Sequence, residues 1–489
     1  MRLAALAPLL GLAVCLAYSA PALAQPQFSA PGAPTSLTPQ QQAARAIYQQ
    51  LVEINTVDSV GSVTQAAEAM AVRFRAAGFA AQDVQLLGPA DAPEKHNLVV
   101  RYRGKGGGKP ILLLAHLDVV AALRADWPRD PFVMHEANGY FFGRGVADDK
   151  SMAAMLVANL LRYKAEGWVP ERDLILALTA DEEGGGRNGV GWLLEHHKAL
   201  IDAEYAINEG GGGTLKDDAP FFHSVQAAEK VPVNFTLTVL NSGGHSSVPR
   251  KDNAIYQLAN AIGRIERHTF PVALNEVTTA FFSQTAKVEM PSLAAAMRVI
   301  VANPTDAEAA ALISMDPRYA SMLRTSCVAT RLAAGHADNA LPQTATANIN
   351  CRIVPTSTAN EVKAVLDRVI GDSIVAVSLR QRVGAQERYG VAPVAIHPAV
   401  LAATTALTKK MFNDVPVIPT MSTGATDGRF LRAAGIPTFG VSGIFSAAGE
   451  TNAHGRDEKL RVKSFYDGLE FLYQLVKTVA GPDAGKPIS

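Results

Sequence analysis

The chain has 489 residues, which is too long for a single small hydrophobic core and suits two or three domains. Apolar residues make up 48% and charged residues 18%, a composition that is typical of globular proteins and excludes a largely disordered chain. The 45 basic residues balance the 45 acidic ones, so charge gives no reason to expect a nucleic-acid partner or an anionic membrane. We therefore expect a small-molecule partner.

The first 24 residues are predicted to be an export signal that does not belong to the fold. Arg2 supplies a positive start, residues 3–18 are apolar, and Ala22 and Ala24 form a small-x-small cleavage site. The apolar run is too short for a membrane anchor, and no later stretch reaches the roughly 20 apolar residues that a span needs. Residues 25–39 are expected to form a flexible mature N-terminus. After cleavage near Ala24, the protein should be periplasmic or secreted, without a membrane span.

Helices and buried strands alternate along residues 40–229, the predicted first part of an α/β domain. They are, in chain order, helices at 40–53 and 63–77, strands at 97–102 and 111–115, a helix at 150–165, a strand at 174–179, a helix at 191–197 and a strand at 204–208. This order implies a largely parallel sheet with helices on both faces. The pattern resumes in residues 388–489, the predicted second part, with a helix at 399–411, a strand at 438–441 and a helix at 462–479.

Residues 230–387 follow a different pattern and are predicted to form an inserted α+β domain. Apolar and polar residues alternate along three segments, which is typical of half-exposed antiparallel strands. These segments are 233–239, 345–354 and 374–379, and the helices predicted to cover their sheet are 253–267 and 360–370. Residues 270–334 are less periodic, and we assign no elements to them.

Two cysteines remain once the signal is removed, Cys327 and Cys351. Two cysteines form neither a disulfide scaffold nor a thiolate metal site. They could pair in an oxidising compartment or remain two separate buried thiols, and the sequence leaves both alternatives open.

The strand at 111–115 ends in His116 and Asp118, which by themselves could be no more than a capped turn. Other segments of the α/β part also end in metal-binding side chains. These are Asp148 and Asp149 before a helix, Glu182 and Glu183 after the strand at 174–179, Glu209 after the strand at 204–208, and His454 in a late loop. Each acidic group taken alone could be a helix cap or a solvated end. Because the strand ends of a parallel sheet meet at one crevice, we expect these side chains to converge.

Two imidazoles and several carboxylates suit Zn²⁺, with Co²⁺ or Mn²⁺ as alternatives. The carboxylates exceed what one ion needs, which favours two metal ions that share a bridging carboxylate.

The motifs HLD, GRGVADDK, DEE, INEG and NAHG, in this order, resemble those of a zinc exopeptidase and deacylase family. Its members include carboxypeptidase G, carboxypeptidase S, succinyl-diaminopimelate desuccinylase, acetylornithine deacetylase, aminoacylase and carnosine dipeptidase. The resemblance covers nearly the whole mature chain. It implies a mostly parallel-sheet di-zinc catalytic domain with an inserted α+β lid and dimerisation domain. Two departures are Ser151, where a glycine is common, and the greater length of the inserted domain.

The resemblance also implies a role for each residue of the site. His116, Asp148 and Glu209 would bind one zinc ion, and Asp148, Glu183 and His454 the other. Asp118 would orient His116, and Glu182 would be the general base that takes a proton from the attacking water. The peptide bond between Asp148 and Asp149 is often cis in this family.

The chain resembles the family at four further positions, three of them in the inserted domain. His245, in SGGHSSVP, resembles a histidine that stabilises the oxyanion, often from the partner subunit, although it could be a simple turn residue. Asn339 and Arg352 resemble a pair that binds the substrate carboxylate, and the alternative for Arg352 is a surface arginine on a lid strand. Gly424, which follows the insertion, resembles the glycine loop that lines the substrate pocket.

The leading hypothesis is an exported di-zinc hydrolase that cleaves an amide next to a free carboxylate in a small peptide or an N-acyl amino acid. Glu209 favours this reading, because aminopeptidase relatives tend to carry aspartate there. One alternative is a dipeptidase or aminopeptidase with the same site, and another is a non-catalytic peptide- or metal-binding protein. Glu182 argues against the second alternative, since a binder has no use for a general base. A homodimer formed through the inserted domain is also expected from the resemblance.

Overall fold

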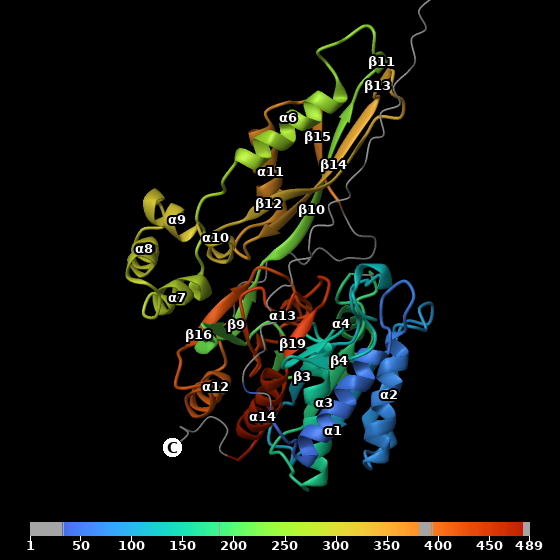
Figure 1. Cartoon of the computed structure of the whole chain (residues 1–489), viewed down its shortest axis with the longest axis vertical. Coiled ribbons are helices and arrows are strands. Elements are labelled where there is room, and N and C mark those ends of the chain that lie inside the picture. The colour runs from blue at the N-terminus through green and yellow to red at the C-terminus, as the bar shows by residue number, and fades with distance from the viewer. Residues whose placement is uncertain (1–31, 33, 185, 381–392, 394, 483–489) are drawn as a thin grey trace, which may run out of the picture.

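The computed structural model describes Gly32 and residues 34–482, apart from residues 185, 381–392 and 394. The expected export signal at 1–24 and the expected domain boundary at 387/388 lie outside the described residues. Two bodies are visible in Figure 1, a broad lower body and a narrower upper body that extends away from it. We call the lower body, which contains residues 39–229 and 398–479, the catalytic body. We call the upper body, which contains residues 231–267 and 326–379, the lid. In the part of the chain that the structure describes, no helix combines the length and apolar character needed to cross a membrane.

A ten-stranded sheet forms the centre of the catalytic body. Its strands run in the order β1-β2-β6-β3-β7-β17-β9-β8-β18, and β16 lies beside β9. Their bounds are β1 Val84–Leu87, β2 Asn97–Tyr102, β3 Ile111–His116, β6 Leu174–Thr179, β7 Tyr205–Asn208, β8 Gly213–Lys216, β9 Ala219–Glu229, β16 Val417–Ser422, β17 Thr438–Gly440 and β18 Phe445–Ala447. The central strands β6, β3, β7 and β17 are parallel, whereas β2 and β9 pair with this group in antiparallel fashion. The predicted mostly parallel sheet is confirmed.

The strands β3 and β6 are buried at every position, because helices cover both faces of this sheet. One face packs against α1 (Pro39–Glu53), α2 (Val63–Ala76), α3 (Lys150–Ala165), α12 (Pro398–Met411) and α14 (Val462–Val479). The other face packs against α4 (Gly189–His196), α5 (Lys198–Ile201) and α13 (Gly428–Ala433). Local signals set the helix ends: Thr38 and Gln41 form a capping box at the start of α1, and Gly78, with φ +78°, follows α2. A small antiparallel sheet joins β4 (His135–Ala137), β5 (Tyr140–Phe142) and β19 (Lys459–Arg461).

The lid is a four-stranded antiparallel sheet with helices on one face. The strand order is β12 (Ser326–Ala334), β14 (Thr344–Ile353), β10 (Val231–Leu240) and β15 (Val375–Leu379). Buried and half-exposed residues alternate along β10 and β14, and the buried ones pack against α6 (Ala254–Arg267) and α11 (Ala359–Ile370). The short strands β11 (Gly244–His245) and β13 (Ala340–Leu341) pair at the far end of the lid (Figure 1). The chain enters the lid directly from β9 through Lys230.

The segment left without assigned elements is mostly helical. It forms α7 (Glu276–Thr285), α8 (Pro291–Ala302), α9 (Ala307–Ile313) and α10 (Pro317–Leu323), before β12 begins. These helices share a core with Phe222 of β9 and Ile418 of β16. They therefore pack against an edge of the catalytic sheet and lie beside the base of the lid in Figure 1. Short helices of 7 to 12 residues carry too few turns for their periodicity to be clear in the sequence.

Cys327 on β12 and Cys351 on β14 are directly opposite each other in the register and are joined by a disulfide bond. The sequence left open whether the two cysteines are paired or separate, and the structure shows that they are paired.

The sequence pattern missed β9 and β16, which lie in the large sheet. β9 carries buried polar side chains, among them His223 and Gln226, so it lacks the continuous apolar run of β3. His223 is fully buried, with Nδ1 2.7 Å from the hydroxyl of Thr408 and Nε2 2.5 Å from the carbonyl oxygen of Ser442. Two hydrogen bonds make a neutral imidazole acceptable at this buried position.

His223 should make stability fall in mild acid. Burial lowers the pKa of His223 to about 4, whereas the unfolded chain has an ordinary histidine pKa of about 6.5. Between these values the unfolded chain binds a proton that the folded protein does not, so stability is lost as the pH falls through this window, by about 3 kcal/mol in full. Urea unfolding at pH 7 and pH 4.5, with chelator present throughout, measures the loss. A His223→Gln variant should lose this part of the pH dependence, and an unchanged dependence would contradict the assignment.

Candidate active site

The carboxyl ends of the central strands bring together three of the expected metal ligands. His116 ends β3, Glu183 follows β6, and Asp148 precedes α3. One ligand atom from each lies within 4.8 Å of the others, and His116 Nε2 is 3.0 Å from Asp148 Oδ1. The peptide bond between Asp148 and Asp149 is cis, as the resemblance implies.

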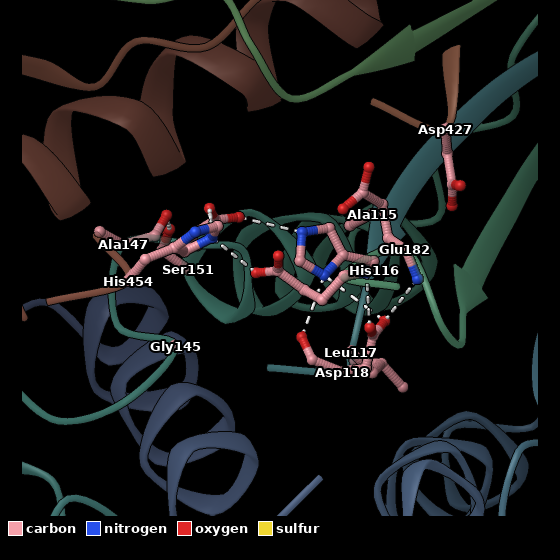
Figure 2. A network of polar contacts seen from close by, with 12 residues as sticks. Ala115, His116, Leu117, Asp118, Gly145, Ala147, Ser151, Glu182, Asp427 and His454 are labelled. Atoms are coloured by element: carbon pink, nitrogen blue, oxygen red, sulfur yellow. Dashed lines mark hydrogen bonds and ion pairs between the residues drawn. The ribbon is translucent and has the colours of Figure 1, made fainter. Parts of the chain in front are cut away.

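His454 completes this group from a loop far along the chain. Its Nε2 atom is 3.2 Å from Asp148 Oδ2 and 2.9 Å from Glu183 Oε1. The Asp148 carboxylate thus directs one oxygen to each histidine, and Figure 2 shows the His116 and His454 rings in one network of contacts. This is the arrangement that a carboxylate bridging two metal ions requires.

Glu182 and Glu209 line the same cavity as these ligands. Burial raises the pKa of Glu182 to about 8 and raises that of Glu209 well above its usual range, and neighbouring acidic groups add to both effects. Glu209 Oε2 is buried and has no hydrogen-bond partner among the described residues. A cluster of buried carboxylates with an unpartnered oxygen is costly without a compensating cation. The residues present therefore fit a pair of divalent metal ions.

Asp118 supports both His116 and the loop that carries the glutamates. Its Oδ1 atom lies 3.6 Å from His116 Nδ1, and its backbone oxygen lies 3.0 Å from the same nitrogen. The backbone N–H groups of Glu182 and Glu183 donate to the two Asp118 carboxylate oxygens, at 3.1 and 2.9 Å. Such contacts hold an imidazole in one orientation, as the predicted role of Asp118 requires.

Glu458 is a supporting residue that the sequence did not reveal. It is fully buried, and its carboxylate accepts hydrogen bonds from the backbone N–H groups of Gly145, Ala147 and Asp148, at 2.8 to 3.1 Å. Arg144 donates to the same carboxylate at 2.6 Å and to the carbonyl oxygen of Gly455 at 3.0 Å. Together they tie the Asp148 loop to the loop that carries His454. The only sequence signal was an acidic residue four positions after that histidine.

A cavity of about 1850 Å³ lies between the catalytic body and the lid and contains the site. Arg352 of β14 and Gly424, which follows β16, line it together with four of the metal-ligand candidates, Asp148, Glu183, Glu209 and His454. His245 and Asn339 do not line it, because they lie exposed beside the β11–β13 pair at the far end of the lid. A single chain therefore brings two of the four expected substrate-side residues to the site and leaves the other two remote.

A parallel-sheet edge that holds two histidines and several carboxylates next to a large cavity defines a metal-dependent hydrolase. The sequence profile of Peptidase family M20/M25/M40 matches residues 112–478. The chain belongs to this family, whose members are metal-dependent, and it is a metallopeptidase or amidohydrolase. The family expected from the motifs is confirmed.

Similar proteins include peptidases and an N-acyl amino acid hydrolase. The probable carboxypeptidase S-like 2 of Dictyostelium discoideum is 28% identical over 399 residues, which cover 78% of this chain and 74% of that protein. The N-fatty-acyl-amino acid synthase/hydrolase PM20D1 of Homo sapiens is 28% identical over 382 residues, covering 76% and 74%. The M20 family metallo-carboxypeptidase Sso-CP2 of Sulfolobus solfataricus shares the fold, with a TM-score of 0.66, 17% identity and coverage of 89% and 98%.

Proposed function

We propose that the protein hydrolyses an amide bond next to a free carboxylate, in an N-acyl amino acid or a small peptide. The observation that carries the proposal is the placement of Arg352 in the same cavity as the metal-ligand cluster. Within the described residues, no carboxylate lies within 4.0 Å of this guanidinium to neutralise it. An unpaired arginine beside a reaction site is suited to hold a substrate carboxylate.

The proposed chemistry assigns one task to each residue. The cofactor would be two Zn²⁺ ions, with Co²⁺ or Mn²⁺ as alternatives, held by His116, Asp148 and Glu209 and by Asp148, Glu183 and His454. When bound, these ions would polarise the scissile carbonyl group and lower the pKa of water. Glu182 then takes a proton from the attacking water and passes it to the leaving nitrogen. Asp118 keeps His116 in the required orientation.

The names of two similar proteins support this choice of substrate. One is a probable carboxypeptidase S-like protein, and the other is the N-fatty-acyl-amino acid synthase/hydrolase PM20D1. The alternative is a dipeptidase or aminopeptidase with the same site. The two candidate functions differ in the unblocked group that the substrate must carry. The first requires a free carboxylate, and the second requires a free amine.

The test compares N-acyl amino acids, free dipeptides and N-acetylated dipeptides, each with a free or an amidated C-terminus. We expect acetylated substrates to be cleaved, amidated ones to be cleaved at least about tenfold more slowly, and chelator to abolish activity, which added Zn²⁺ restores. A strict requirement for a free amine would instead establish the aminopeptidase alternative.

We also propose that the protein works after export. The disulfide between Cys327 and Cys351 supports this, because disulfides persist mainly in oxidising compartments. Mass spectrometry of the protein recovered from the periplasm or medium should show an N-terminus close to Gln25, whereas an intact N-terminus in the cytoplasm would contradict export.

A homodimer would bring the remote His245 and Asn339 to a partner's site. The support is an exposed edge strand, β12, whose Val328 and Leu332 side chains are 58% and 63% exposed. Such an edge is suited to pair with a second copy. Co-expressed Glu182→Gln and His245→Ala chains should recover about a quarter of wild-type activity, because each mixed dimer has one site with neither substitution. Failure of the mixture to exceed its separate components would exclude a shared site.

A further inference from the structure

Arg352 shares the cavity with a second arginine, Arg429. Arg352 belongs to β14 of the lid, and Arg429 belongs to α13 of the catalytic body, and both line the space that contains Glu182. The sequence analysis singled out Arg352 alone, since Arg429 in TDGRF has no pattern that separates it from a surface arginine.

Among the described residues, neither of these two arginines forms an ion pair with the protein, although Asp427 interacts electrostatically with Arg429. Cavity-lining Arg187 forms an ion pair with Asp91, whereas neither Arg352 nor Arg429 has a carboxylate within 4.0 Å in the described ranges. The Arg429 guanidinium lies over the Phe430 ring, 4.7 Å from its centroid. Burial and the positive charge of Arg429 both lower the pKa of Arg352, and the charge of Glu182 acts in the opposite direction. The Arg352 guanidinium thus lies within electrostatic reach of both Arg429 and the proposed base.

We propose that Arg429 is a second substrate-binding residue, and that Arg352 and Arg429 hold the same substrate carboxylate in the cavity. This inference rests on the proposed function, which supplies one carboxylate next to the scissile amide. Two like charges repel each other until an anion lies between them, and a carboxylate has two oxygens that can each accept from a different guanidinium. Because the arginines come from different bodies, the substrate carboxylate would also join the lid to the catalytic body.

The test measures the preference for a free carboxylate, as the ratio of kcat/KM for an N-acyl amino acid to that for its carboxamide. In Arg429→Met this ratio should fall about 10- to 100-fold, while kcat/KM for the carboxamide stays within about threefold of wild type. Arg429→Lys should restore part of the preference. Arg187→Met is the matched control, since that cavity arginine already has a carboxylate partner, and it should leave the ratio unchanged.

Three results would overturn the inference. In the first, Arg429→Met keeps the wild-type ratio. In the second, both substrates lose activity equally, which indicates a general structural defect. In the third, the variant changes only the preference for N-acetylglutamate over N-acetylglutamine. This would show that Arg429 binds the side-chain carboxylate of the substrate and not the one next to the scissile amide. A wild-type enzyme that does not prefer the carboxylate refutes the proposed function itself, and is recognised before any variant is made.

Discussion

Replacing Glu182 with glutamine should lower kcat by about 10³-fold while both metal ions stay bound. Glutamine has nearly the same shape, but its amide cannot accept the proton that the attacking water must lose, and general-base catalysis typically contributes 10²- to 10⁴-fold. Glu182 is not one of the proposed ligands, so metal binding should not depend on its charge. The measurement is kcat for an N-acyl amino acid together with metal content per chain by elemental analysis.

A matched control for this variant is Glu195→Gln. Glu195 on α4 lines the same cavity but is exposed and is not a proposed ligand, so its substitution should leave both kcat and metal content unchanged. Undiminished turnover in Glu182→Gln with metal still bound would refute the proposed mechanism. Loss of metal in this variant would instead indicate that Glu182 is itself a ligand.

Replacing Asp148 with asparagine should reduce metal content by at least one ion per chain and abolish measurable turnover. The Asp148 carboxylate directs one oxygen toward His116 and the other toward His454, and an amide offers only one neutral oxygen. The thermal midpoint of the variant should therefore respond less to added Zn²⁺ than that of the wild type, since stabilisation by a ligand follows its affinity.

The control for Asp148→Asn is Asp202→Asn, at an aspartate that forms a surface ion pair with Lys109. It should bind metal normally, because surface ion pairs contribute little. A fully active wild-type preparation with one zinc ion per chain would show that the enzyme uses a single metal ion, and the bridging role of Asp148 would then be wrong.

The elements that the sequence predicted well are those with a strong local pattern. The strands at Ile111–His116 and Leu174–Thr179 are apolar at every position but the last, and the helix Lys150–Ala165 has apolar residues at helical spacing. β9 was missed because its buried positions include His223, whose partners, Thr408 and Ser442, are supplied by distant segments. A partner that is remote in the chain leaves no trace in local periodicity.

The residues of the candidate site also fall into those that the sequence could predict and those that it could not. His116, Asp148, Glu183 and Glu209 could be predicted to converge, because the rule that parallel strands end at one edge converts their sequence positions into a shared location. Glu458 and Arg429 could not be found in this way. Glu458 acts through backbone N–H groups of another loop, and Arg429 is distinguished by lining the cavity with no ion-pair partner among the described residues.

By itself, the sequence determined the family, the sheet edge that carries the chemistry and the types of side chain gathered there, since these follow from local patterns and one general rule of topology. Tertiary structure alone decided that Cys327 pairs with Cys351, that His245 and Asn339 lie far from the site of their own chain, and that Arg429 lines the same cavity as Arg352. Each of these depends on how two segments that are remote in the chain are placed relative to each other. That placement is set by packing between remote residues, which no local stretch of sequence records.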